Sequence, residues 1–104
     1  MEQTPSIGRI VHYRLTDKDA QHVNRRRVAK PHEPGWPAGA QAHIGNSAAA
    51  GETVPLLIVR VWPNENGSGW GINGQAFLDG NDSLWITSAK EGAEPGCWSW
   101  LARV

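Results

Sequence analysis

The chain has 104 residues, with ten basic and ten acidic side chains and no formal net charge. This length is typical of one domain, so we expect a single domain over residues 1–104. Balanced charge provides no global positive field, which argues against nucleic acid and anionic membranes as partners. The one cysteine, Cys97, excludes an internal disulfide and a cysteine-rich metal site.

The remaining composition favours a β-rich protein of the cytoplasm. No apolar run is long enough to span a bilayer, and the start MEQTPSIGRI lacks the basic-then-apolar order of a secretory signal. We therefore expect a soluble cytoplasmic protein without a membrane partner. Twelve glycines and seven prolines separate short β-branched or aromatic runs, a composition that favours strands over helices.

The first half of the chain contains two predicted strands. In residues 7–15, alternation places Val11, Tyr13 and Leu15 on one face together with Ile7. Residues 54–62 are almost continuously apolar and end at a turn-rich segment, which predicts the central strand.

Three further strands are predicted in the second half. Residues 70–78 contain Gly71 and Gly74, which indicate a bulge or a close approach of backbone. Residues 84–87 follow a turn signal and are rich in strand formers, and residues 97–104 place Trp98 and Trp100 on one face. The expected fold is mostly β: a small five-stranded antiparallel barrel or curved sheet, Src-homology-3-like, whose closure removes exposed edges.

Residues 16–53 interrupt the strand pattern and are expected to form a long insertion loop after strand one. A loop of this length is uncommon in a compact domain and is often functional. Within it, residues 41–44 are compatible with a short strand, and residues 46–51 with a turn or one helical turn.

No familiar catalytic or metal-binding pattern is present. The four histidines lie about ten residues apart without nearby ligand partners, so no zinc site is expected. Gly67-Ser68-Gly69 lacks the lysine of a phosphate-binding loop, and no serine lies in a nucleophile elbow. The sequence therefore predicts a protein that is not an enzyme and has no metal or cofactor.

Six tryptophans are the most unusual feature of the chain. A small domain buries only two or three such rings, because each is large and its ring nitrogen needs a partner. One interpretation places Trp62, Trp85 and either Trp98 or Trp100 inside the barrel. The others, notably Trp36 and Trp70 near glycine and proline, then stack on a flat ligand or cover a subunit interface.

Arginines supply the second half of such a site, because a guanidinium binds phosphate with two hydrogen bonds and stacks on bases. The run at residues 25–27 is either a phosphate contact or a solvated charge run, and Tyr13 is either a ligand contact or core. The candidate ligand-binding residues are His12, Tyr13, Arg14, Arg25, Arg26, Arg27, Trp36, Trp70, Trp98, Trp100 and Arg103.

Both ends of the chain resemble a family of small bacteriophage proteins, most without an assigned function. The resemblance covers Ser6 to Tyr13, Glu91 to Trp100 and, loosely, residues 56–62, whereas residues 16–53 look specific to this member. The family's usual Trp-His-Trp ending, with proline after the second tryptophan, is changed here, since Ser99 and Leu101 replace the histidine and the proline. The resemblance implies a phage accessory protein and does not by itself imply a ligand.

Small phage proteins include sponges that sequester nucleotide signals of bacterial immunity, such as cyclic dinucleotides. Our leading hypothesis is a non-catalytic homo-oligomeric sponge in the host cytoplasm, which needs only stacking faces and phosphate donors. The main alternative is a protein-binding or structural module anchored by exposed tryptophans. Binding of single-stranded nucleic acid is disfavoured by the neutral charge.

Overall fold

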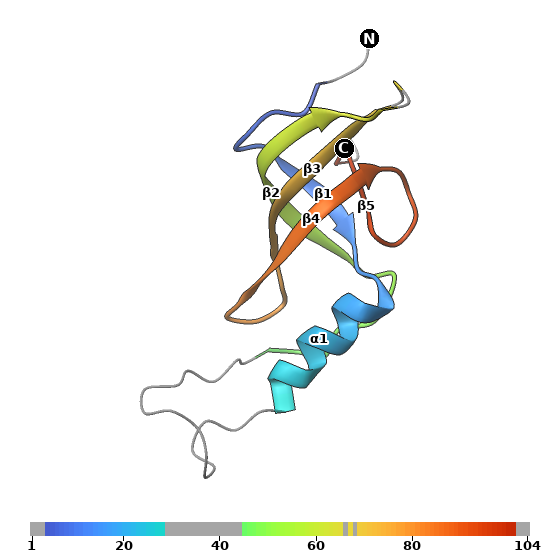
Figure 1. Cartoon of the computed structure of the whole chain (residues 1–104). Coiled ribbons are helices and arrows are strands. Elements are labelled where there is room, and N and C mark those ends of the chain that lie inside the picture. Colours follow the sequence, from blue (N-terminus) through green and yellow to red (C-terminus); the bar gives the residue numbers. More distant parts are fainter. Residues whose placement is uncertain (1–3, 29–44, 66, 68, 102–104) are drawn as a thin grey trace.

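The computed structural model describes residues 4–28, 45–65, 67 and 69–101. In chain order these form β1 (Ile10–Arg14), α1 (Asp17–Val28), β2 (Thr53–Pro63), β3 (Trp70–Phe77), β4 (Ser83–Glu91) and β5 (Cys97–Ser99). The strands make one closed barrel, and α1 lies beyond one end of it, next to the turn between β3 and β4 (Figure 1). In the described parts of the chain, no helix is long and apolar enough to cross a membrane.

The barrel confirms the expected mostly-β, five-stranded architecture, with one difference in strand direction. Neighbouring strands are antiparallel from β1 to β4 and between β1 and β5, whereas β4 and β5 are parallel. Strands that alternate in direction around a closed ring must be even in number, so closure with five strands requires a parallel pair. The prediction that every strand pair of the barrel is antiparallel was therefore wrong for the β4–β5 pair.

The inward face of the barrel follows the period-two pattern of the strands. On β1, Val11 and Tyr13 are buried and His12 between them is half-buried. The centre of the core is Trp98 on β5, which is completely buried. Trp85 is half exposed on β4, so its predicted place in the core was wrong: Leu84 and Ile86 on either side point inward, which directs Trp85 outward.

The predicted irregularity around Gly71 and Gly74 is present. The β3–β4 register shifts between Ile72 and Gly74, and the β2–β3 register shifts between Ile58 and Arg60. A Cβ at Gly74 would collide with the backbone oxygen of Leu57 on the neighbouring strand. Glycine at this position therefore permits the close backbone approach that strand curvature requires.

The predicted insertion loop was wrong over its first third, where the chain forms the 12-residue helix α1. Its start is a reciprocal cap: the Asp19 backbone N–H donates to Oγ1 of Thr16 (3.1 Å), and the Thr16 N–H donates to Oδ2 of Asp19 (3.0 Å). Ala20 and Val23 are buried on its inner side. So short an apolar stripe gives little helical periodicity, which explains why the sequence pattern did not indicate a helix.

The segment that leads into β2 packs beside α1. Asn24 binds the backbone of Ala48 in both directions, donating to its oxygen (2.8 Å) and accepting from its N–H (2.7 Å). Of the alternatives for residues 46–51, the structure has a turn at residues 50–51 and no helical turn. The short strand expected at residues 41–44 lies outside the described residues.

Candidate functional site

The candidate residues on β1 are mostly occupied by contacts within the fold. The Tyr13 hydroxyl donates to Oδ2 of Asp19 (2.6 Å), and burial, followed by this carboxylate, raises the pKa of Tyr13 above its usual value. Arg14 donates to the backbone oxygens of Gly51 (3.1 Å) and Ala93 (2.6 Å). Tyr13 therefore lies in the core and Arg14 joins two loops, while His12 is half-buried on the outer face.

Three candidate tryptophans are brought together by the barrel. The indole N–H of Trp98 donates to the backbone oxygen of Trp70 (2.8 Å), and its ring meets Trp100 edge to face at a centroid distance of 5.3 Å. The Arg9 guanidinium lies over the Trp100 ring, 5.4 Å from its centroid. Trp98 is thus core, and Trp70 and Trp100 are half-buried against it. Trp36 and Arg103 lie outside the described residues.

The basic run at the end of α1 divides into two kinds of residue. Arg25 is exposed, whereas Nη1 of Arg26 and Nη1 of Arg27 both donate to Oδ2 of Asp82, at 3.0 and 2.9 Å. Burial would raise the pKa of Asp82, but hydrogen bonds and charge from Arg27 and then Arg26 outweigh it, so the pKa is lowered. These two arginines attach α1 to the turn before β4.

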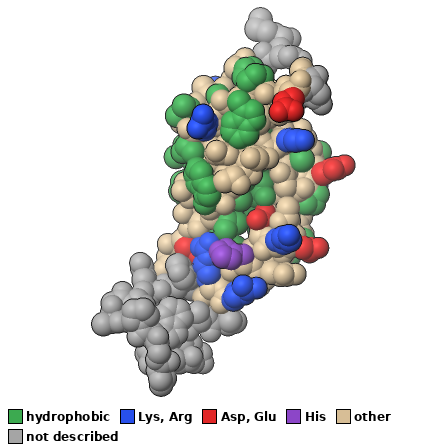
Figure 2. All heavy atoms as spheres, in the orientation of Figure 1, with side chains coloured by type: hydrophobic (Ala, Val, Ile, Leu, Met, Phe, Trp, Pro, Cys, Tyr) green, Lys and Arg blue, Asp and Glu red, His purple; other side chains and the backbone are tan. Residues whose placement is uncertain are grey.

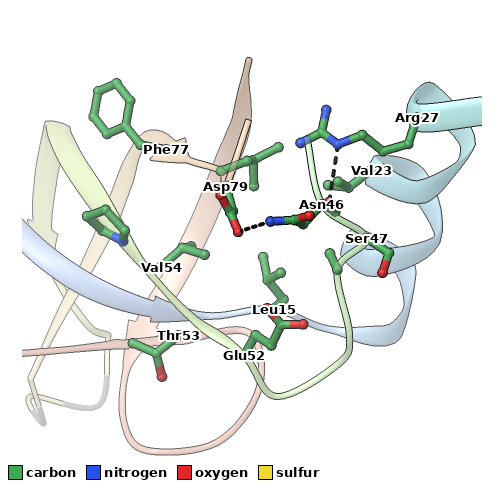
Figure 3. Close-up of a pocket in the computed structure, with 13 residues that line it drawn as sticks. Leu15, Val23, Arg27, Asn46, Ser47, Glu52, Thr53, Val54, Phe77 and Asp79 are labelled. Atoms are coloured by element: carbon green, nitrogen blue, oxygen red, sulfur yellow. Dashed lines mark hydrogen bonds between the residues drawn. The ribbon is translucent and has the colours of Figure 1, made fainter. Parts of the chain in front are cut away.

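A cavity of about 420 Å³ opens between α1, the segment before β2 and the β3–β4 turn (Figure 3). Its walls combine apolar side chains from the barrel and from α1 with a polar set. The apolar members are Leu15, Val23, Ala48, Val54, Pro55, Phe77 and Leu78, and the polar members are Arg27, Asn46, Ser47, Glu52, Thr53 and Asp79. This mixture of an apolar lining and a few polar groups is typical of small-molecule sites.

Arg27 is the most unusual group on the cavity wall. Its side chain is only 8% exposed, and its Nε donates to the backbone oxygen of Asn46 (3.3 Å). Its Nη2 is buried and has no hydrogen-bond partner within the described part of the chain. A buried, charged donor without an acceptor costs free energy, which makes this atom the strongest indication of a missing ligand group.

The sequence pattern named Arg27 as a candidate and missed Asp79. Asn46 could read a base edge by its residue type, but it was left out of the candidates because asparagine also serves turns. The side chains of Asn46 and Asp79 point toward each other inside the cavity lining, with Nδ2 donating to Oδ2 (2.8 Å; Figure 3). Both residues come from turn-like segments, where asparagine and aspartate are common for local reasons. No signal in the sequence distinguished this pair from ordinary turn residues.

A second hollow, of about 430 Å³, lies on the barrel and is lined by Trp62, Asn64, Glu65 and Lys90. The Trp62 ring lies against Gly71, where a Cβ would come within 2.6 Å of its Cε2. It contains none of the candidate residues and no buried donor that lacks a partner among the described residues. We therefore take the cavity beside α1 as the candidate site.

The described residues hold no group of three or more histidine, cysteine, aspartate or glutamate side chains placed to share a metal ion. No protein-family model, no curated protein and no solved structure matches this chain. The resemblance to small phage proteins therefore stays a prediction, and any function must be argued from the cavity beside α1.

Proposed function

We propose that this protein is a non-catalytic binding protein that sequesters a small nucleotide-type molecule in the cavity beside α1. The observation that carries the proposal is the buried Nη2 of Arg27, which has no hydrogen-bond partner among the described residues and belongs to a side chain on the cavity wall. A phosphate oxygen would satisfy this donor, and guanidinium groups bind phosphate more specifically than ammonium groups do.

The size and lining of the cavity support a ligand of this class. Its volume of about 420 Å³ lies within the usual range for small-molecule sites, roughly 300–1,000 Å³. Leu15, Val23 and Val54 provide apolar surface for the faces of a base and sugar, and Phe77, 45% exposed, is at the rim.

The wider hypothesis, a phage sponge for a cyclic dinucleotide-like immune signal in the host cytoplasm, is part of this proposal. A cyclic dinucleotide has two bases and two phosphates, whereas one cavity offers one guanidinium nitrogen, Nη2 of Arg27, that lacks a partner among the described residues. Two copies of the chain, each holding one half of the ligand, would match this stoichiometry. The expected homo-oligomer follows from that pairing.

A second candidate function, a protein-binding module, is favoured by the outer surface of the barrel. Ile10, Leu57, Gln75 and Trp85 lie in register across β1 to β4, and Ile10 and Trp85 are 47% and 50% exposed. Figure 2 shows hydrophobic side chains over the barrel and a group of Lys, Arg and His side chains toward α1. An exposed tryptophan within an apolar band is typical of an anchor for a partner protein.

Isothermal titration calorimetry of the full chain with a panel of linear and cyclic nucleotides tests the first function. We expect at least one nucleotide to bind with a dissociation constant on the order of micromolar or lower. Arg27→Lys keeps a cation beside Asp82 but removes the forked donor, so it should weaken binding about tenfold or more. Arg25→Gln, on the exposed side of the same helix, is the matched control and should bind as the unaltered protein does.

A panel without measurable heat would refute the sponge function, and so would equal binding by the unaltered protein and Arg27→Lys. The protein-binding alternative is tested by Trp85→Ala, which should abolish capture of a stoichiometric partner from infected cells. Under the sponge function, Trp85→Ala should leave nucleotide binding unchanged, because Trp85 does not line the cavity.

A further inference from the structure

The cavity beside α1 carries opposite charges on different walls, which limits the nucleotides that suit it. Arg27 contributes the positive group, and Asp79 and Glu52 contribute carboxylates. A base that offered only acceptors to Asp79 would leave lone pairs facing one another without a proton between them. A ligand that suits the whole cavity therefore has an anionic end and a second end that carries N–H donors.

Asp79 is held in position to accept such donors. Its Oδ2 accepts from Nδ2 of Asn46 (2.8 Å), and its backbone oxygen accepts from the Asn46 N–H (2.9 Å). A carboxylate has about four lone-pair positions, so this contact leaves acceptor capacity for a ligand. One bond from Asn46 holds the Asp79 carboxylate and the other holds the Asp79 backbone, which reduces the cost of ordering this side chain on binding.

The backbone at Gly45 brings the Asp79 turn and Arg27 close together. Gly45 pairs with Gly80 in an isolated β-bridge. A Cβ on Gly45 would lie 2.9 Å from Nη2 of Arg27 and would also collide with the backbone oxygen of Asp79. Glycine at this position thus allows the Asp79 turn and the Arg27 side chain to approach each other closely.

We infer that the cavity selects a guanine-type nucleotide, with the base donating to Asp79 and the phosphate binding Arg27. This inference rests on the proposed nucleotide-binding function and names the ligand class of the same site. Guanine presents two adjacent donors, N1–H and the 2-amino group, which match the two oxygens of one carboxylate. Adenine presents an acceptor, N1, beside its amino group, so it meets the carboxylate with one donor at most.

The test is calorimetric titration of the full chain with GMP, AMP and xanthosine monophosphate. Two-point recognition of a base edge predicts that GMP binds roughly 10- to 100-fold more tightly than AMP. Asp79→Asn replaces one acceptor with a donor, which matches the N1–H and 2-oxo groups of xanthine. This variant should therefore prefer xanthosine monophosphate to GMP, and its amide oxygen still accepts from Asn46.

Glu94→Gln is the matched control, because it makes the same carboxylate-to-amide change at an exposed position that does not line the cavity. It should keep the preference for GMP. Equal affinity for GMP and AMP would overturn the guanine inference and leave the proposed function standing. An Asp79→Asn variant that melts like the unaltered protein but still prefers GMP would also overturn it. Absence of binding by all three nucleotides would overturn the guanine inference, and absence of binding by the wider panel of linear and cyclic nucleotides would overturn the proposed function as well.

Discussion

Replacing the Asp82 carboxylate by an amide should detach α1 from the barrel, because this group is the acceptor for two arginines of the helix. The Asp82 side chain is 6% exposed, and those of Arg26 and Arg27 are 20% and 8% exposed. Removing one partner of a buried ion pair costs about 3–5 kcal/mol. Asp82→Asn keeps one acceptor and Arg26 keeps some solvent, so we expect the lower end, about 3 kcal/mol.

Urea denaturation followed by circular dichroism measures this effect, and a thermal melt should show a decrease of roughly 10–20 °C. Glu94→Gln, the same type of change at an exposed position, should stay within about 0.5 kcal/mol. Folding lowers the pKa of Asp82, so the ionised carboxylate stabilises the folded protein. This stabilisation is complete above the ordinary pKa of 3.8 and is lost as the pH falls through the lowered pKa of the folded state. On acidification, Asp82→Asn should therefore lose less stability than the unaltered protein does. If Asp82→Asn destabilises the protein by less than about 1 kcal/mol at pH 7, the assigned role of Asp82 is refuted.

Three further outcomes follow from contacts in the fold. Thr16→Ala should destabilise the protein by about 1 kcal/mol, measured by urea denaturation, because it removes the acceptor for the Asp19 N–H; no change would contradict the capping assignment. Tyr13 is the one tyrosine of the chain, so an absorbance titration reports its ionisation directly. The native protein should form no phenolate near the ordinary tyrosine pKa of about 10, and a titration midpoint at that pH would place Tyr13 at the surface. Trp98→Phe should lower the free energy of unfolding, measured by thermal denaturation, by roughly 1–3 kcal/mol, because it removes core volume and the donor to the Trp70 backbone oxygen. Unchanged stability would show that the indole is not central to the core.

Most of the barrel could be predicted because strand periodicity is a local property. The alternation in residues 10–14 and the strand formers in residues 53–63 gave the correct element type, and the glycines at 71 and 74 indicated the irregular register. By contrast, α1 carries few apolar residues and depends on its Thr16 cap and its contacts with the barrel. Helices of this kind give a weak pattern, because tertiary contacts rather than periodicity stabilise them.

The candidate site could be predicted only in part. The sequence named Arg27 through its basic run, but whether that run was solvated or bound depended on Asp82, 55 residues further along the chain. Likewise, the number of tryptophans did not reveal that Trp98 is buried and Trp85 is half exposed, because each position is decided by strand register.

The sequence by itself determined that the chain is rich in strands, which five segments contain them and which side chains alternate within them. Two strand ends were wrong, because β4 continues to Glu91 beyond the expected residue 87, and β5 ends at Ser99 instead of residue 104. Tertiary structure alone decided the parallel pairing of β4 with β5, the docking of α1 on the barrel and the cavity whose lining includes both Arg27 and Asp79. The physical reason is range: alternation depends on neighbouring residues, whereas closure and cavity formation depend on contacts between segments far apart in the chain.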